Sequence, residues 1–276
     1  MPLEPFDEVA LLLLAASTLG IARKRLRALA RGEDAGLREW IAGRAHNVTS
    51  ARESARADAE LLDSLGAKIL TLTDEAYPPG LRDLRSPPAF LTVRGNLPPS
   101  GIAVVGSRKP PKPAQDFARD VARLARIPVI AGLALGIDAA AHRGALASGT
   151  PTLAYVGTGL RNVYPPEHVD LQDRILAGGG AIASERLPSA TVTDWALVQR
   201  DRLQAAHARL VLLIASERNG GAMHTMRFAA ELGRPRFALR EEGGAEFEGN
   251  LQALASGAIA LEFDAKAAAA ALTAEY

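Results

Sequence analysis

Apolar and polar positions divide the chain into a helical first part and an alternating second part. Between residues 5 and 65, apolar side chains recur at helical spacing, with basic side chains on the remaining faces. From Lys68 onward, short apolar runs alternate with longer amphipathic stretches. The pattern predicts a small N-terminal all-helical module over 1–66, a main domain over 67–263 and a C-terminal helical tail over 264–276.

The main domain is predicted to be an α/β fold, Rossmann-like and doubly wound, with a mostly parallel sheet. Short apolar strands separated by amphipathic helices are typical of a parallel sheet covered on both faces. The predicted strands of this sheet are 101–105, 127–131, 152–156, 181–184, 210–215 and 236–239, and the helices between them are 114–126, 138–147, 166–177, 194–206 and 222–232. Two shorter strands are predicted before the sheet, at 68–74 and 87–95.

Small and basic residues gather where the predicted strands end. Such sheets bind ligands beyond the carboxyl ends of their strands, and backbone N–H groups near helix N-termini favour anions there. Gly106, Ser107, Arg108 and Lys109 follow the strand 101–105, while Arg161 and Asn162 follow the strand 152–156. These residues predict an anion-binding site spread along one edge of the sheet, longer than one mononucleotide needs.

Each of these motifs also has a purely structural interpretation. The tripeptide from Gly106 to Arg108 is compatible with an ordinary turn between a strand and a helix. We predict that Asp138 is a helix N-cap and that His142 serves packing or a hydrogen bond rather than catalysis. The run 200–202 is compatible with a solvated helix face.

Several familiar catalytic and cofactor sites are missing from the sequence. No Gly-x-Gly-x-x-Gly follows Val105, and there is no P-loop motif. The chain has no cysteine, and its five histidines lack the spacing of metal ligands. We therefore expect a protein that is not an enzyme and that uses neither a cofactor nor a metal ion.

Charge and hydropathy place further limits. The formal net charge is only +1, but five of the 32 basic residues are lysine, so 27 are arginine, whose planar fork suits phosphate. A GC-rich genome explains this bias equally well, so the position of each arginine carries the argument. The apolar run 9–16 is too short to span a bilayer and follows acidic residues, so we expect no membrane segment and a cytoplasmic protein.

An ordered set of short motifs resembles the DNA processing protein A (DprA/Smf) family over roughly residues 70–260. The matching segments are 87–97 (PPAFLTVRGNL), 104–108 (VVGSR), 131–146 (AGLALGIDAAAHRGAL), 157–160 (GTGL), 164–168 (YPPEH), 184–185 (SE), 200–202 (RDR), 221–225 (GAMHT), 231–234 (ELGR) and 249–251 (GNL). One departure is Leu135, which stands where the family usually has arginine. The helical N-terminus resembles the SAM-like or helix-hairpin module of that family.

The resemblance implies sequence-independent binding of single-stranded DNA (ssDNA), commonly by a homodimer. It also implies protection of DNA in natural transformation and help in loading RecA recombinase onto strands coated by single-strand-binding protein. By position in the motifs, Arg108 is the first candidate for contact with DNA, and the others are Arg161, Asn162, His168, Arg200 and Arg202. Tyr164 is the aromatic side chain placed best for stacking on a base.

Two other functions remain open on the same fold. One is a nucleotide phosphoribohydrolase-like enzyme, although the glycines at 178–180 do not lead into the motif of that group. The other is a module that senses nucleotides without catalysis. If the ssDNA interpretation holds, Arg108 and Arg161 should lie on the same edge of the sheet.

Overall fold

The N-terminal part of the chain folds into four helices. The computed structural model describes residues 8–43, 46–241 and 243–276, so residues 1–7 of the predicted helical module lie outside it. The four helices are α1 (Glu8–Thr18), α2 (Arg23–Ala30), α3 (Ala35–Ala42) and α4 (His46–Ser64). Helix α4 extends over 19 residues because Val48, Ala51, Ala55 and Ala59 repeat every three or four residues and are buried, although alanine gives only a weak hydrophobic signal.

The rest of the described chain is built on one sheet of nine strands in the order β1-β2-β6-β5-β4-β3-β7-β8-β9. All neighbours from β6 to β9 in that order are parallel, whereas β1 pairs with β2, and β2 with β6, antiparallel. The strands are β1 (Ala67–Thr71), β2 (Phe90–Gly95), β3 (Ile102–Val105), β4 (Val129–Ala131), β5 (Thr152–Tyr155), β6 (Ala181–Ser184), β7 (Leu210–Leu213), β8 (Arg236–Leu239) and β9 (Ile259–Leu261). The prediction of a Rossmann-like, mostly parallel sheet is therefore confirmed.

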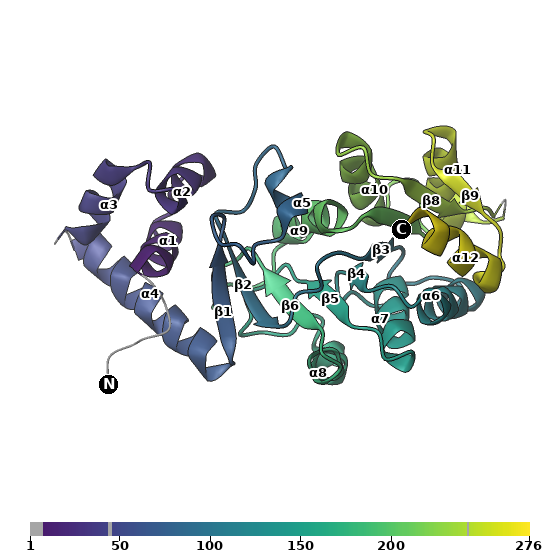
Figure 1. The fold of residues 1–276 in the computed structure, drawn as a ribbon, viewed down its shortest axis with the longest axis horizontal. Helices are drawn as coiled ribbons and strands as arrows, with labels where there is room; N and C mark the ends of the chain where they lie inside the picture. Colours follow the sequence, from purple (N-terminus) through teal and green to yellow (C-terminus); the bar gives the residue numbers. More distant parts are fainter. Residues whose placement is uncertain (1–7, 44–45, 242) are drawn as a thin grey trace.

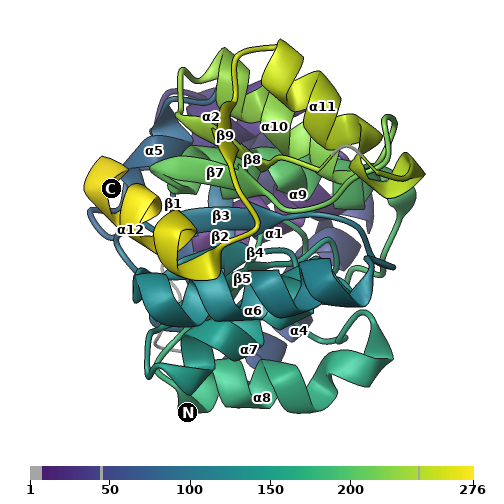
Figure 2. The same ribbon diagram turned by 90° about the vertical axis from the view of Figure 1, so that its right-hand side faces the viewer.

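Helices cover both faces of this sheet. The remaining helices are α5 (Pro79–Arg82), α6 (Lys112–Ala125), α7 (Ile137–Ala147), α8 (Val169–Ala177) after a 3₁₀ turn at Pro166–His168, α9 (Asp194–His207), α10 (Ala222–Glu231), α11 (Glu248–Ala255) after a 3₁₀ turn at Ala245–Phe247, and α12 (Ala265–Glu275). Figure 2 shows α6, α7 and α8 on one side of the strands and α9, α10 and α11 on the other. None of the described helices combines the length and apolar character that crossing a bilayer requires.

The central strand β3 shows how the two faces are filled. Ile102 and Val104 belong to the core under α6 and α7, whereas Ala103 and Val105 belong to the core under α9 and α10. Side chains alternate across a strand, so a strand covered on both faces is apolar throughout. This is why β3 appears in the sequence as a continuous apolar run.

Both ends of the chain pack into these cores. Buried side chains of α1 and α4 share one hydrophobic cluster with β1 and β2, so the helical module lies against the antiparallel edge of the sheet (Figure 1). At the other end, α12 packs on α6 through Ala268, Ala269 and Leu272.

The strand order also creates a crevice. From β3 the chain winds through β4 and β5 to β6 on one side, and it then returns to β7 on the other side of β3. The loops that leave β3 and β7 therefore diverge, and ligands of open α/β sheets bind at such a point.

Candidate functional site

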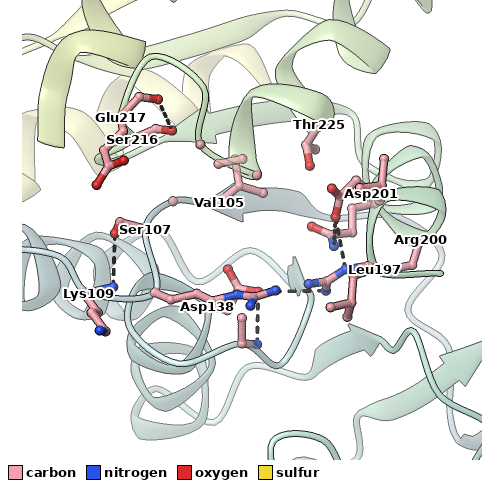
Figure 3. Close-up of a pocket in the computed structure, with 18 of the residues that line it drawn as sticks. Val105, Ser107, Lys109, Asp138, Leu197, Arg200, Asp201, Ser216, Glu217 and Thr225 are labelled. Carbon is pink, nitrogen blue, oxygen red and sulfur yellow. Dashed lines mark hydrogen bonds and ion pairs between the residues drawn. The ribbon is translucent and has the colours of Figure 1, made fainter. Parts of the chain in front are cut away.

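A cleft of about 480 Å³ lies at this crevice, beyond the carboxyl ends of β3 and β7. It is lined by the loops that follow β3, β4 and β7 and by one face of α9 (Figure 3). Four of the predicted site residues after β3 line it, namely Gly106, Ser107, Arg108 and Lys109. The position agrees with the expectation that the site lies at the carboxyl edge of the sheet.

The loops after β3 and β4 support each other. The Ser107 carbonyl oxygen accepts a hydrogen bond from the Ile137 N–H at 3.2 Å, and the Ser107 hydroxyl accepts one from the Lys109 N–H at 3.0 Å. Gly136 has φ of +79°, and a Cβ there would lie 2.4 Å from the Ser107 carbonyl oxygen. Only glycine permits this backbone conformation and this close approach. The Ser107 hydroxyl is thus engaged in holding the loop that carries Arg108.

Asp138 has a different role from the predicted helix cap. The N-cap of α7 is Gly136, so Asp138 lies inside the first turn. Its carboxylate accepts hydrogen bonds from the N–H groups of Gly132 and Ala134, at 2.9 and 3.2 Å. The cap prediction was therefore wrong, because the carboxylate reaches back to the loop after β4. These two N–H groups are consequently not available to a ligand.

Arg200 lies in the wall of the cleft and is almost completely buried. Its guanidinium donates to the Tyr155 carbonyl oxygen at 3.1 Å, lies 3.0 Å from an Asp201 carboxylate oxygen and lies 3.9 Å from one of Asp138. Figure 3 shows Arg200 reaching from α9 toward Asp138. A Cβ at Gly132 would lie only 1.1 Å from the guanidinium, so Gly132 leaves the space that Arg200 occupies.

Burial sets the protonation of the two carboxyls beside Arg200. Desolvation raises the pKa of Asp138, against the opposing attraction of Arg200. Desolvation also raises the pKa of Asp201 to about 7, although the Arg200 guanidinium opposes it. Asp201 thus lies close to Arg200 and still has a raised pKa, because the carboxylate loses more free energy from its lost hydration than it gains from the Arg200 guanidinium.

Arg108 and Lys109 are the cations of the cleft that face solvent. Both are exposed, and neither forms an ion pair with a carboxylate in the described part of the chain. Arg108 also lines a small adjoining cavity together with Leu135 and Tyr164, whose side chain is 38% exposed. A cation and an aromatic ring therefore flank the same opening.

The other predicted contact residues lie elsewhere. Arg161 and Asn162 are exposed at the same edge of the sheet, but they do not line the cleft, and Arg161 lies near Asp58 of α4. His168 is buried, with its Nδ1 2.8 Å from the Leu133 carbonyl oxygen.

Arg202 is also buried, and its guanidinium pairs with Glu185. His168 and Arg202 are buried and do not line the cleft, whereas Arg200 lines it but is buried and already paired. The interpretation of 200–202 as a solvated helix face was wrong for the same reason.

One exposed aromatic side chain beside this region had no signal in the sequence. Trp195, in the first turn of α9, is 54% exposed. Within residues 8–43, 46–241 and 243–276, no group of three or more His, Asp or Glu side chains has the arrangement of a metal site.

The fold and the cleft define a doubly wound α/β protein with exposed cations at the switch point of its sheet and an aromatic ring in the adjoining cavity. The model of the DNA recombination-mediator protein A family matches residues 68–271. The chain therefore belongs to that family.

Relatives and solved structures agree with this assignment. The chain is 34% identical over 175 residues to DNA processing protein DprA of Streptococcus pneumoniae, covering 61% of each protein, and 30% identical over 173 residues to Protein Smf of Borreliella burgdorferi, covering 60% of this chain and 55% of the relative. It is similar to the crystal structure of S. pneumoniae DprA, with 25% identity and a TM-score of 0.68 over 92% of this chain and 91% of that one. It also has the fold of Helicobacter pylori DprA, a structure described for its single-stranded DNA binding mode, with 24% identity and a TM-score of 0.67 over 76% of this chain and 97% of that one. The chain spans between 46% and 61% of the length of the first curated relatives it matches.

Proposed function

We propose that this protein binds single-stranded DNA, without sequence preference, at the cleft between β3 and β7. The observation that carries the proposal is the pair Arg108 and Lys109, exposed and without a close ion pair among the described residues, at the switch point of the sheet beside Tyr164. Membership of the DNA recombination-mediator protein A family supports it. Binding of ssDNA by the H. pylori protein, which shares this fold, is consistent with it.

In this proposal, each group of the cleft has a defined part. Arg108 and Lys109 bind phosphate oxygens, and Tyr164 stacks on an unpaired base. Arg200 does not touch the strand. It neutralises the carboxyls of Asp138 and Asp201 and so holds the wall of the cleft in place.

The charge balance of the cleft limits how many phosphates it binds. Three cations line it (Arg108, Lys109 and Arg200), together with four carboxyl side chains (Asp138, Asp194, Asp201 and Glu217). Since Arg200 is already paired, about two phosphates are neutralised here. For a single strand, the slope of log K against log salt concentration should then be about −1.4.

Replacing Arg108 with alanine should weaken binding of ssDNA roughly 10- to 100-fold, because a charge-assisted hydrogen bond to phosphate is lost. The magnitude of the salt slope should fall by about 0.7, which corresponds to one phosphate. Mobility shift or anisotropy titrations over a series of salt concentrations measure both quantities. The matched control is Arg174→Ala, which removes an exposed arginine in the last turn of α8, before the amino end of β6.

A parallel titration with duplex DNA of equal length tests whether the protein prefers single-stranded DNA or is attracted to any DNA phosphate. We expect at least 10-fold tighter binding of the single strand, because stacking on Tyr164 needs an unpaired base. Equal affinities of wild-type protein and Arg108→Ala for ssDNA would remove the cleft from the proposal.

Family membership supports proposals about partners. As a recombination mediator the protein would act in the cytoplasm as a homodimer, help to load RecA onto DNA covered by single-strand-binding protein, and protect DNA in natural transformation. We propose no chemical step for the cleft. Release of free base from nucleoside monophosphates would favour the phosphoribohydrolase alternative, and saturable binding of a mononucleotide without binding of oligonucleotides would favour the sensor. The glycines 178–180 precede β6 and so lie at the edge of the sheet opposite the cleft, which disfavours the enzyme.

A further inference from the structure

A second cavity, of about 320 Å³, lies between the helical module and the main domain. One wall consists of the end of α1, the α1–α2 connection and α2, including Ser17, Arg23 and Leu26. The facing wall consists of residues 88–90 at the start of β2 and of the loop after β6, which carries Glu185 and Arg186. The cavity therefore depends on both parts of the chain.

Positive charge exceeds negative charge around this cavity. Arg23 and Arg186 line it, and Glu185 is the one carboxylate among its lining residues in the described chain. Glu185 is already shared, because the guanidinium of Arg23 donates to it at 3.2 Å and that of Arg202 pairs with it as well. The single negative charge of Glu185 therefore cannot balance the three positive charges of Arg23, Arg186 and Arg202.

Polar atoms at the same place lack partners. Two polar atoms of its lining residues, the Ser17 hydroxyl and the Arg186 Nε, are buried without a hydrogen bond. Unsatisfied buried donors are costly in a folded protein, so a group of them around a cavity indicates a ligand that carries hydrogen-bond acceptors. An anion fits both the charge and these donors.

An aromatic ring stands beside the two arginines. The guanidinium carbons of Arg23 and Arg186 lie 5.0 and 5.9 Å from the centroid of the Trp195 ring, which nevertheless remains 54% exposed. A large exposed indole next to cations is the combination that binds a nucleobase and its phosphate together.

Trp195 also connects the two cavities. The preceding residue, Asp194, lines the cleft between β3 and β7, whereas Arg186 and Arg23 line the second cavity. The first turn of α9 therefore lies between the two cavities, with Asp194 at one and Trp195 beside the arginines of the other.

We propose that bound single-stranded DNA continues from the cleft to a second subsite, where a base stacks on Trp195 and a phosphate lies between Arg23 and Arg186. This inference rests on the proposed function of the cleft. It gives the helical module, through Arg23, a direct part in binding the strand. Longer strands gain from both subsites, because the second contact is intramolecular once the first has formed.

The test uses the two tryptophans of the chain as reporters. Trp40→Phe leaves Trp195 as the remaining indole, and Trp195→Phe leaves Trp40, which is 44% exposed on α3. Binding itself is followed by the anisotropy of a labelled oligothymidylate of about 16 nucleotides, with one of about 4 nucleotides for comparison. Indole emission should be quenched by the longer strand in Trp40→Phe and unchanged in Trp195→Phe.

The affinities of three variants for the longer and the shorter strand are the second part of the test. Trp195→Ala should weaken binding of the longer strand roughly 5- to 150-fold, as expected for loss of one stacked base, and should leave the shorter strand unaffected. Trp40→Ala is the matched control and should bind as wild type does. Arg186→Ala, which keeps the indole, should also weaken binding of the longer strand alone.

The outcomes separate the two proposals. If wild-type protein binds and Arg108→Ala weakens binding, but the emission of Trp195 and the affinity of Trp195→Ala do not change, the second subsite is wrong and the cleft stands. If Arg108→Ala is neutral while Trp195→Ala weakens binding, the cleft is wrong, and the strand binds near Trp195 without the continuous path proposed here. Absence of any anisotropy change with wild-type protein overturns both.

Discussion

Replacing Arg200 with methionine is expected to lower the free energy of unfolding by about 3–5 kcal/mol at pH 8. The substitution removes the cation that lies 3.0 Å from Asp201 and 3.9 Å from Asp138, and it leaves two carboxylates buried without their partner. An uncompensated buried charge has an effect of about this size. Urea unfolding at constant pH measures the change as a shift of the midpoint.

Two comparisons make this result specific. Arg218→Met removes an exposed arginine that pairs with Glu248 at 3.4 Å, and it should change stability by less than about 1 kcal/mol. The effect of Arg200→Met should also shrink at pH 5, because the carboxyls can then take up protons. A loss of stability that is equal at pH 5 and pH 8 would show that packing of the side chain, and not its charge, matters at this position.

Asp201→Asn is expected to become progressively more stable than wild type as the pH rises from 4 to 8. The pKa of Asp201 is raised from 3.8 to about 7 in the folded protein, so between these values the folded state binds more protons than the unfolded state. Wild-type stability due to this group therefore falls as the pH rises through that window. The rise of the Asp201 pKa from 3.8 to about 7 corresponds to about 4 kcal/mol of wild-type stability that is lost by pH 8. Asparagine does not titrate, so Asp201→Asn does not show this loss.

The difference between the two proteins is the quantity to measure, since other groups titrate in the same range. Burial lowers the pKa of His142 to about 3 and that of His207 to about 4. A depressed histidine pKa makes stability rise with pH up to the unfolded value, which opposes the effect of Asp201. Both histidines are present in both proteins, so their contributions cancel in the difference. A difference that stays constant from pH 4 to pH 8 would contradict the raised pKa.

The main elements of the fold could be predicted because their signals are local. The six strands 101–105 to 236–239 are apolar runs, and such runs mark strands that are buried on both faces. The elements β9 and α11 were not predicted. Both are short, with three residues in β9 and eight in α11, and the exposed Ile259 and Leu251 show that apolar character does not follow burial there.

The site could be predicted only in part, because its partners are distant in sequence. The position of Arg108 follows from its place directly after a strand. Burial of Arg202 depends on Glu185, and the surroundings of Trp195 depend on Arg23 and Arg186. No spacing rule connects these residues, because they meet only when α2 packs beside the loop after β6 and the start of α9. Arg161 was predicted at the correct edge, but the loop after β5 is two strands away from β3.

Amide hydrogen exchange with and without an oligothymidylate of about 16 nucleotides tests the central claim most directly. If the cleft binds the strand, exchange should slow in peptides that contain the lining residues 106–109, 216–217 and 220–222, and it should stay unchanged over 172–180 near the opposite edge. Saturating binding that leaves the peptides of the loops after β3 and β7 unprotected would contradict that claim.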